Sequence, residues 1–295
     1  MNILWYHCVG IFFLKKLKAI KEDDMKKILT VLMCSIVLFG FFKNAYAYSA
    51  PQVDVSVNGI LVDFTDEVFL KNSLTYVPLR EFCEEIGLFV EWDNNKRIAS
   101  VSFENSFLEC YPDKSIAFLN EKENKNIIFK NNKIYISLRN VAGLLSGEVK
   151  WYHDIYTAEI NSDKELNVNN KKSYTKDDVF WLTKIINAES AGEPIMGKIA
   201  VGNVILNRVK SSEFPNNVYS VVFDRKYGVQ FEPIINGSIY NDHTLDCIFA
   251  AKRALSGENY AGESLYFLNP KTASNSWIVN NRTFMVSINN HDFYL

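Results

Sequence analysis

The chain has 295 residues, of which 48% are hydrophobic and 22% charged, and its formal net charge is −2. These values are ordinary for globular proteins, and the length allows two domains with separate cores. The near-neutral charge and the lack of a basic cluster after residue 47 argue against nucleic-acid binding. The elements described below predict a two-domain α+β protein.

The first 47 residues have the features of a targeting segment. Met25-Lys26-Lys27 precedes an almost wholly apolar run from Ile28 to Phe42, and Ala45-Tyr46-Ala47 fits the small-residue pattern of a cleavage site. The apolar run is short for a membrane-spanning helix. We therefore expect an N-terminal extension and signal peptide over residues 1–47, cleaved after Ala47 to release a secreted protein. Met1 and Met25 are both candidate starts of translation, and we favour Met25.

A repeated sequence follows. Tyr76-Val77-Pro78-Leu79-Arg80 recurs 59 positions later as Tyr135-Ile136-Ser137-Leu138-Arg139, and the same offset relates Trp92 to Trp151. An ungapped match of this kind indicates an internal repeat. In each copy, apolar residues at helical spacing precede a strand-like segment, which predicts a short helix packed on strands. We expect an α/β repeat module, with two copies of this unit, over residues 48–161.

The start of this segment has the pattern of a β-hairpin, with Val53, Val55 and Val57 leading to Asn58-Gly59. Together with the repeat, it resembles the copper amine oxidase N-terminal-like module of secreted bacterial proteins. We expect no copper site, because His153 is the only histidine of the segment and no ligand set accompanies it. The candidate partners of the module are the cell wall or another protein. Four repeated aromatic residues are candidate contacts, but their matching positions favour buried roles in two similar cores: Tyr76, Trp92, Tyr135 and Trp151.

Three cysteines lie after residue 47, namely Cys83, Cys110 and Cys247. An odd number spread over two domains does not support a disulfide framework, so we expect free, buried thiols, with a Cys83–Cys110 bridge as the open alternative. Residues 162–174 are polar and lack periodicity, which predicts a linker before a second domain at residues 175–295.

The second domain begins with a helix that carries a carboxylate on its apolar face. Thr175 and Asp178 form a capping-box pattern, apolar residues follow at helical spacing, and Glu189 continues their stripe. Gly192 then ends the helix, which places Glu189 in its last turn. Partial burial and the negative end of the helix dipole should both raise the pKa of Glu189, as a general acid requires.

A longer pattern surrounds Glu189. Residues 193–209 predict a helix that is apolar on most of its circumference. With Glu189, the following motifs resemble the SleB-type cell wall hydrolases, the spore cortex-lytic family: Gly192-Glu193-Pro194, Phe214-Pro215, Gly228-Val229-Gln230-Phe231, Leu265-Tyr266-Phe267-Leu268-Asn269-Pro270, Ser276-Trp277 and His291-Asp292-Phe293-Tyr294. The resemblance implies a mainly helical, lysozyme-like catalytic domain in which Glu189 is the catalytic residue.

The resemblance also implies a reaction, namely lytic transglycosylation of peptidoglycan at the bond between muramic acid and N-acetylglucosamine, in the cell wall or spore cortex. Glu189 would act as acid and then as base, so that no second carboxylate is needed. Two alternatives stay open: a water-using muramidase or glucosaminidase, and a non-catalytic wall-binding germination scaffold. A hydrolase would need a second carboxylate. Glu193 is one candidate, although we expect it to cap or orient the next helix, and Asp224 and Glu232 are weaker candidates.

Sugar binding by this domain should rest on aromatic faces and amide groups. The candidate substrate-binding residues are Gln230, Phe231, Tyr266, Asn269 and Trp277. Metal chemistry is not expected, because the chain has only four histidines and none belongs to a ligand-spaced motif. The sequence therefore predicts an enzyme that uses neither a metal nor another cofactor.

Overall fold

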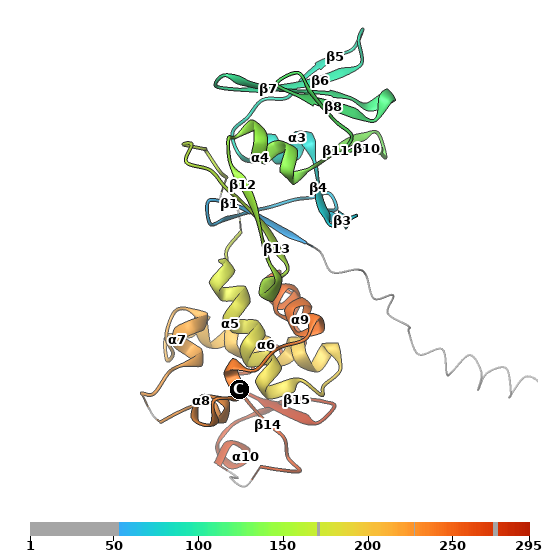
Figure 1. The fold of residues 1–295 in the computed structure, drawn as a ribbon. Coiled ribbons are helices and arrows are strands. Elements are labelled where there is room, and N and C mark those ends of the chain that lie inside the picture. Colours follow the sequence, from blue (N-terminus) through green and yellow to red (C-terminus); the bar gives the residue numbers. More distant parts are fainter. Residues whose placement is uncertain (1–52, 170–171, 227, 274–276) are drawn as a thin grey trace, which may run out of the picture. The chain divides into compact units, whose positions relative to one another are not determined.

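The computed structural model describes residues 53–169, 172–226, 228–273 and 277–295 (Figure 1). The predicted signal peptide and both candidate translation starts lie outside these ranges. Among the helices within them, none has the length and apolar character that a membrane crossing requires.

The N-terminal part of the described chain is rich in β-structure. Three sheets are formed, with strand orders β12-β13-β1-β2, β10-β11-β4-β3 and β5-β6-β7-β8-β9. Two short helices accompany the sheets. The elements are β1 (Asp54–Val57), β2 (Ile60–Val62), β3 (Phe69–Lys71), β4 (Leu74–Pro78), α3 (Leu79–Glu85), β5 (Glu91–Asp93), β6 (Ile98–Phe103), β7 (Ser106–Tyr111), β8 (Ile116–Leu119), β9 (Lys122–Asn124), β10 (Ile127–Lys130), β11 (Lys133–Ser137), α4 (Leu138–Leu144), β12 (Glu148–Tyr152) and β13 (Thr157–Asn161), with 3-10 turns at Pro112–Lys114 and His153–Ile155.

The predicted hairpin is present, because β1 and β2 pair antiparallel around Asn58-Gly59. Each of the two helices follows a strand without a break, β4 leading into α3 and β11 into α4. The strands β4 and β11 pair with each other in antiparallel register, with Val77 opposite Ile136. A short helix packed on strands is therefore found at both places where the sequence pattern predicted one.

The four repeated aromatic residues have two different environments. Tyr76 and Tyr135 are buried, with exposed fractions of 5% and 4%. Trp92 and Trp151 are 40% and 38% exposed, so the expectation that they are core residues is wrong. The reason is topological: β5 and β12 are edge strands of their sheets, and their side chains lack a neighbouring strand on one side.

The three cysteines within the described residues are free and buried, as the sequence predicted, and no bridge joins Cys83 to Cys110. Burial raises the pKa of the Cys110 thiol to about 12. The segment after β13 differs from the simple linker that was expected. Residues 162–169 form no helix or strand, but Leu166 and Val168 pack against the core of the N-terminal part. This half of the segment is attached to the module because it contributes apolar side chains to that core.

The C-terminal part is mainly helical, as predicted; the lysozyme-like character of its fold stays a prediction. Its elements are α5 (Lys176–Ser190), α6 (Ile195–Lys210), α7 (Val218–Val222), α8 (Glu232–Asn236), α9 (Leu245–Leu255), β14 (Tyr266–Leu268), α10 (Trp277–Asn281), β15 (Phe284–Ile288) and β16 (His291–Tyr294), with a 3-10 turn at Ser238–Tyr240. The three strands form a small sheet in the order β14-β16-β15, which the sequence patterns did not indicate. Helices α5, α6 and α9 supply most of the core.

Local sequence features explain where α5 begins and how closely α6 packs against it. The capping box is formed: Thr175 N donates to Asp178 Oδ2 at 2.9 Å and Asp178 N donates to Thr175 Oγ1 at 3.2 Å. Helix α6 is buried on most sides, and a methyl group at Gly202 would lie 3.0 Å from Ile186 Cδ1. The missing side chain at Gly202 therefore allows α6 to approach α5 closely. This packing fixes the end of α5, where Glu189 lies.

Candidate active site

Glu189 occupies the last turn of α5, one residue before the helix ends at Ser190. Its side chain is only partly exposed. Burial raises the pKa of its carboxyl to about 7, the negative charge of Glu232 adds to the increase, and the positive charge of Arg208 opposes it. A carboxyl group with this pKa is protonated in a substantial fraction of molecules at neutral pH, so it can donate a proton to a substrate.

Arg208 is the main functional candidate that the sequence patterns did not single out. It lies on α6 and is 5% exposed. Its guanidinium carbon is 4.9 Å from the centroid of the Phe214 ring and 5.4 Å from that of Tyr266. Arg208 Nε donates to the carbonyl oxygen of Leu265 at 2.8 Å, whereas Nη1 is buried without a hydrogen-bond partner among the described residues. The available signal was an arginine in a helix predicted to be apolar on most sides.

A buried cation of this kind is costly unless it is paired. Burial lowers the pKa of Arg208 to about 10, while electrostatic interactions with Tyr266, Asp224 and Glu189 oppose the decrease. The guanidinium is still charged at neutral pH, so a positive charge with a free N–H group lies within electrostatic range of Glu189.

An open cavity of about 630 Å³ is lined by Phe214 and Tyr266, the two rings that lie against Arg208, whereas Arg208 and Glu189 are not among its lining residues. Its lining is aromatic and polar, and consists of Glu213, Phe214, Asp224, Lys226, Gln230, Tyr266, Trp277 and Arg282. Arg282 Nη2 donates to Tyr266 Oη at 2.7 Å. The Arg282 guanidinium also lies over the rings of Tyr266 and Trp277, at 4.4 and 5.2 Å from their centroids. One cation thus holds the two rings in place, and 48% of the Trp277 side chain stays exposed.

The structure brings three of the five predicted substrate-binding residues together in this cavity, namely Gln230, Tyr266 and Trp277. Phe231 is 4% exposed and packs against Arg208 at 5.2 Å, so it supports the cation and has no free face for a sugar. Asn269 does not line the cavity; its Oδ1 accepts a hydrogen bond from Lys271 N at 3.0 Å within a turn.

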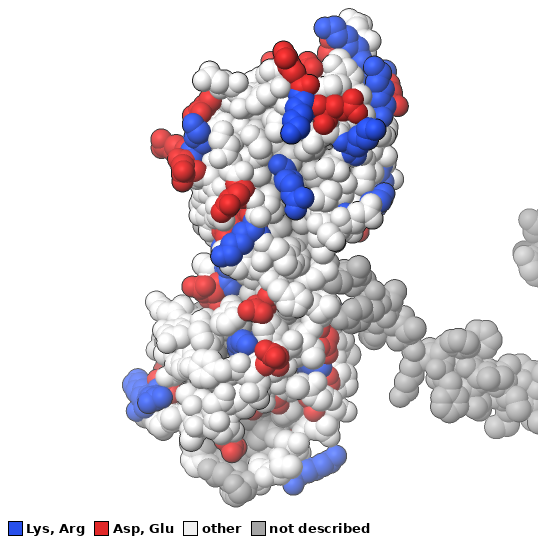
Figure 2. Space-filling model, in the orientation of Figure 1, with Lys and Arg blue, Asp and Glu red and all other residues white. Residues whose placement is uncertain are grey.

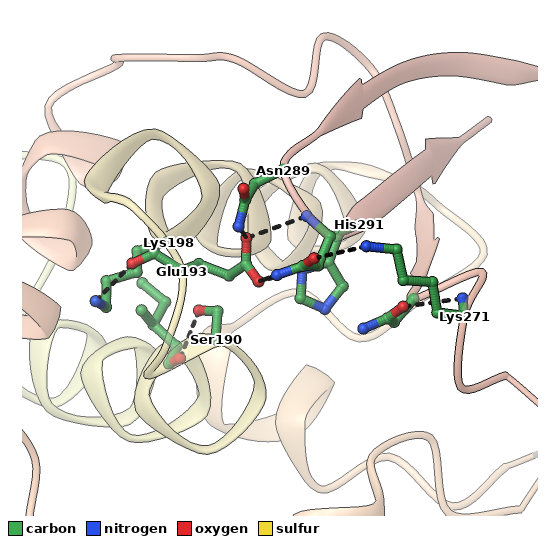
Figure 3. Close-up of polar contacts among 9 residues, drawn as sticks. Ser190, Glu193, Lys198, Lys271, Asn289 and His291 are labelled. Atoms are coloured by element: carbon green, nitrogen blue, oxygen red, sulfur yellow. Dashed lines mark hydrogen bonds and ion pairs between the residues drawn. The ribbon is translucent and has the colours of Figure 1, made fainter.

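Glu193 lies apart from the cavity in a network of its own (Figure 3). Asn289 Nδ2 donates to its Oε2 at 2.8 Å, and Asn290 Nδ2 donates to its Oε1 at 3.0 Å. These hydrogen bonds hold the pKa of Glu193 below its usual value even though burial acts in the opposite direction. No side-chain cap hydrogen bond is formed at the start of α6, so the capping half of the expectation is wrong, while the alternative that Glu193 orients the helix stays a prediction. Glu193 instead fixes the turn between β15 and β16 to the start of α6.

The two weaker carboxylate candidates differ in their relation to Glu189. Glu232 is the first residue of α8 and raises the pKa of Glu189 by charge repulsion. Asp224 lines the cavity and acts on Arg208. Of these two candidates, Glu232 is therefore the one whose charge acts directly on the Glu189 carboxyl.

No group of three or more His, Cys, Asp or Glu side chains within the described ranges could hold a metal ion. On the face shown in Figure 2, lysines and arginines lie beside aspartates and glutamates.

Residues 192–294 match a family model described as Cell Wall Hydrolase, and residues 56–160 match one described as Copper amine oxidase N-terminal domain. The cell wall hydrolase CwlJ of Oceanobacillus iheyensis is 32% identical over 102 residues, which are 32% of this chain and 71% of that protein. The chain belongs to the cell wall hydrolase family. Both resemblances stated from the sequence motifs are thereby confirmed. Glu189 lies just before the first residue of the matched hydrolase region, Gly192.

Two further relatives of this cell wall hydrolase domain are informative. The spore cortex-lytic enzyme of Bacillus cereus is 37% identical over 116 residues, which are 39% of this chain and 43% of that protein. The solved catalytic domain of the germination-specific lytic transglycosylase SleB from Bacillus anthracis is 35% identical and matches with a TM-score of 0.38, covering 42% of this chain and 98% of the other. The chain spans less than half the length of the spore cortex-lytic enzyme that it matches.

Proposed function

We propose that this protein cleaves the glycan strands of peptidoglycan by lytic transglycosylation, with Glu189 as acid and then base. The observation that carries the proposal is the Glu189 carboxyl, whose pKa is raised to about 7 at the end of a buried helix. The names of the relatives support the substrate class. The spore cortex-lytic relatives further favour spore cortex over vegetative wall, and a secreted location follows from the sequence-based signal peptide prediction.

The reaction proceeds in two steps that return Glu189 to its starting state. Protonated Glu189 gives its proton to the glycosidic oxygen between muramic acid and N-acetylglucosamine, the bond from that oxygen to the muramyl anomeric carbon breaks, and positive charge develops on this carbon. The Glu189 carboxylate then takes the proton of the muramyl 6-hydroxyl, whose oxygen bonds to the anomeric carbon. The products are a 1,6-anhydromuramyl end and an N-acetylglucosamine end, and Glu189 is protonated again.

Arg208 serves this cycle by its charge. The guanidinium favours the carboxylate form of Glu189 that follows proton donation, whereas burial and Glu232 favour the protonated form that precedes it. The two influences leave the pKa near neutral, where neither form is strongly disfavoured. A group that acts first as acid and then as base in one turnover requires this balance.

The cavity that is joined to Arg208 through Phe214 and Tyr266 has the lining of a sugar-binding cleft. Tyr266 and Trp277 offer ring faces on which pyranose rings can stack, and Gln230 offers an amide for hydrogen bonds to hydroxyl or acetamido groups. Arg282 keeps both rings in place.

A water-using hydrolase is the second candidate, and Glu232 is the observation that favours it. Its charge interacts with that of Glu189, and a hydrolase needs a second carboxylate to activate water or to stabilise the developing cation. In this case Glu189 keeps the role of acid and Glu232 becomes the base.

Mass spectrometry of the fragments released from purified cortex peptidoglycan tests the proposal, with the Glu189→Gln protein as control. Transglycosylation gives products about 18 mass units lighter than hydrolysis products, because no water is added. We expect the lighter products from the parent and none from Glu189→Gln. Reducing ends would instead support the hydrolase with Glu232 as base. Retained binding with no release from cortex or vegetative wall would support a non-catalytic scaffold.

A further inference from the structure

The N-terminal part of the chain contains two cavities that the proposed reaction does not use. The larger has a volume of about 790 Å³ and lies between α3, the edge strand β5 and the turn that joins β10 to β11. The smaller has a volume of about 350 Å³ and lies between α4, the edge strand β12 and the turn that joins β3 to β4. Each cavity contains one of the two half-exposed tryptophans, Trp92 or Trp151.

The two cavities share a set of equivalent lining positions. All eleven residues of the smaller cavity correspond, at the offset of 59 positions, to residues that line the larger one. In seven pairs the residue of the smaller cavity lies 59 positions after that of the larger one: Leu79 with Leu138, Arg80 with Arg139, Val90 with Val149, Trp92 with Trp151, Asn94 with His153, Arg97 with Tyr156 and Ala99 with Ala158. In the other four pairs the residue of the smaller cavity lies 59 positions before that of the larger one, so each cavity takes its hairpin turn from the other half of the repeat: Phe129 with Leu70, Asn132 with Ser73, Lys133 with Leu74 and Ile134 with Thr75.

The pairing of β4 with β11 explains the exchange. Val77 and Ile136, which are equivalent positions of the two halves, lie opposite each other in antiparallel strands. Antiparallel pairing of equivalent residues places an approximate two-fold axis between the two strands. Each half therefore supplies the helix and the tryptophan of one cavity and the hairpin turn of the other. Two irregularities of packing would have no reason to share these eleven positions. The six further residues of the larger cavity, four of them acidic, have no counterpart in the smaller one.

Both cavities combine a flat aromatic face with a cation. Trp92 and Trp151 are 40% and 38% exposed and are held on edge strands. Arg80 Nη1 donates to the carbonyl oxygen of Val90 at 3.1 Å and lies 3.6 Å from Glu84 Oε1, which fixes this arginine to the cavity wall while 53% of its side chain stays exposed. Arg139 is exposed at the equivalent position. Exposed indole rings stack on sugar rings, and guanidinium groups bind carboxylates through paired hydrogen bonds.

We propose that the two cavities are a pair of equivalent binding sites for glycan strands that carry carboxylate groups, as the muramyl peptides of peptidoglycan do. The proposal rests on the function proposed above for its choice of polymer. A polymer with a repeating unit presents the same epitope many times, so two equivalent sites on one chain can be occupied by neighbouring strands or by one strand. Occupation of both raises the avidity for an insoluble polymer without strengthening either site.

Sedimentation with purified, protein-free peptidoglycan sacculi tests the proposal. The full chain carries Glu189→Gln in this experiment, so that the polymer stays intact. Trp92→Ala and Trp151→Ala are made singly and together, and Phe89→Ala is the matched control, because Phe89 is 71% exposed in the same part of the chain and lines neither cavity. We expect each single change to weaken binding about tenfold and the double change about a hundredfold, as loss of an aromatic anchor from each of two linked sites predicts.

A second pair of changes tests the carboxylate contact and does not depend on the tryptophans. Arg80 and Arg139 are exposed, so Arg80→Glu with Arg139→Glu should fold. This double variant should lose affinity for soluble muropeptide strands and keep the weaker affinity for chitin oligosaccharides, which have the same kind of sugar ring and no carboxylate. The proposal would be overturned if the double Trp92→Ala, Trp151→Ala protein bound sacculi with an affinity within twofold of that of the Phe89→Ala control while its circular dichroism spectrum was unchanged.

The outcome can be separated from that of the proposed function. With Glu189 restored, the double tryptophan variant should cleave short soluble strands as fast as the parent and intact sacculi more slowly. If the parent cleaves nothing but binds sacculi through the two tryptophans, the enzymatic proposal fails and the paired sites stand. If the parent cleaves and the double variant matches it on sacculi, the enzymatic proposal stands and the paired sites fail.

Discussion

Glu232 raises the pKa of Glu189, although the two residues are 43 positions apart and belong to different helices. The first residue of α8 thus lies within electrostatic range of the last turn of α5. Burial alone would already disfavour the Glu189 carboxylate, and the second negative charge adds to that effect. The pH dependence of activity should therefore depend on both residues.

The activity of the parent should fall as pH rises through about 7. Glu189 must be protonated to donate, and its pKa is about 7, so the fraction of competent enzyme decreases above that value. A pH–rate profile on soluble glycan strands at saturating substrate measures this. A profile that stays flat from about pH 5 to pH 9, beyond both sides of the expected pKa, would remove Glu189 from the role of acid.

Glu232→Gln should move that fall in activity to lower pH, by about half to one unit, because a repulsive charge is removed from Glu189. In a transglycosylase the maximal rate should stay within about tenfold of the parent, since Glu232 touches no proton in the reaction. A loss of a hundredfold or more, with hydrolytic products in the parent, is the result that assigns Glu232 as the base of a water-using enzyme.

Arg208→Met should shift the fall in activity to higher pH, by about one unit, because the charge that favours the Glu189 carboxylate is lost. Arg208→Lys keeps the charge and should keep the pH profile close to that of the parent. Both variants lose the hydrogen bond from Nε to Leu265, so both should unfold at lower denaturant concentration. Identical pH profiles for the two variants would show that the charge of Arg208 has no influence on Glu189.

Glu189→Gln should abolish cleavage, with a rate at least a thousandfold lower, and should also stabilise the fold at alkaline pH. The folded-state pKa of Glu189 is raised from 4.5 to about 7, so the native state loses stability as pH rises through this window. Glutamine removes that loss, on the order of 1 to 3 kcal/mol at pH 8 after allowance for partial exposure. Urea unfolding at pH 5 and pH 8 measures it. A stability difference between variant and parent that is equal at both pH values would contradict the raised pKa.

Glu193→Gln should act on stability rather than on chemistry. The carboxylate accepts hydrogen bonds from Asn289 and Asn290, and an amide NH₂ cannot accept them, so we expect a loss of about 1 to 3 kcal/mol. The pKa of Glu193 is lowered, so this contribution is present above its unfolded-state pKa and is lost as pH falls through the folded-state value. Urea unfolding at pH 7 should show the loss of stability. The rate of glycan cleavage, measured at urea concentrations well below the unfolding midpoint, should stay near that of the parent. A selective loss of rate without a loss of stability would restore Glu193 as a catalytic candidate.

The sequence by itself determined the features that depend on neighbouring residues. The capping box at Thr175, the end of α5 near Gly192, the hairpin at Asn58-Gly59 and the short helices at Leu79 and Leu138 follow from local hydrogen bonding and from apolar spacing. The same patterns placed Glu189 on an apolar stripe, which is why its raised pKa could be predicted from one helix. Spacing also revealed the repeat.

The tertiary structure decided what distant segments do to one another. Arg208 reaches electrostatic range of Glu189 only because α6 packs on α5, and the Phe214 and Tyr266 rings around Arg208 come from separate elements. The exposure of Trp92 and Trp151 depends on which strands are at sheet edges, and no local pattern encodes the order of strands. Glu193 is fixed by a turn nearly a hundred residues away. Burial, charge interactions and sheet order are properties of the packed chain, so they could be known only once the packing was known.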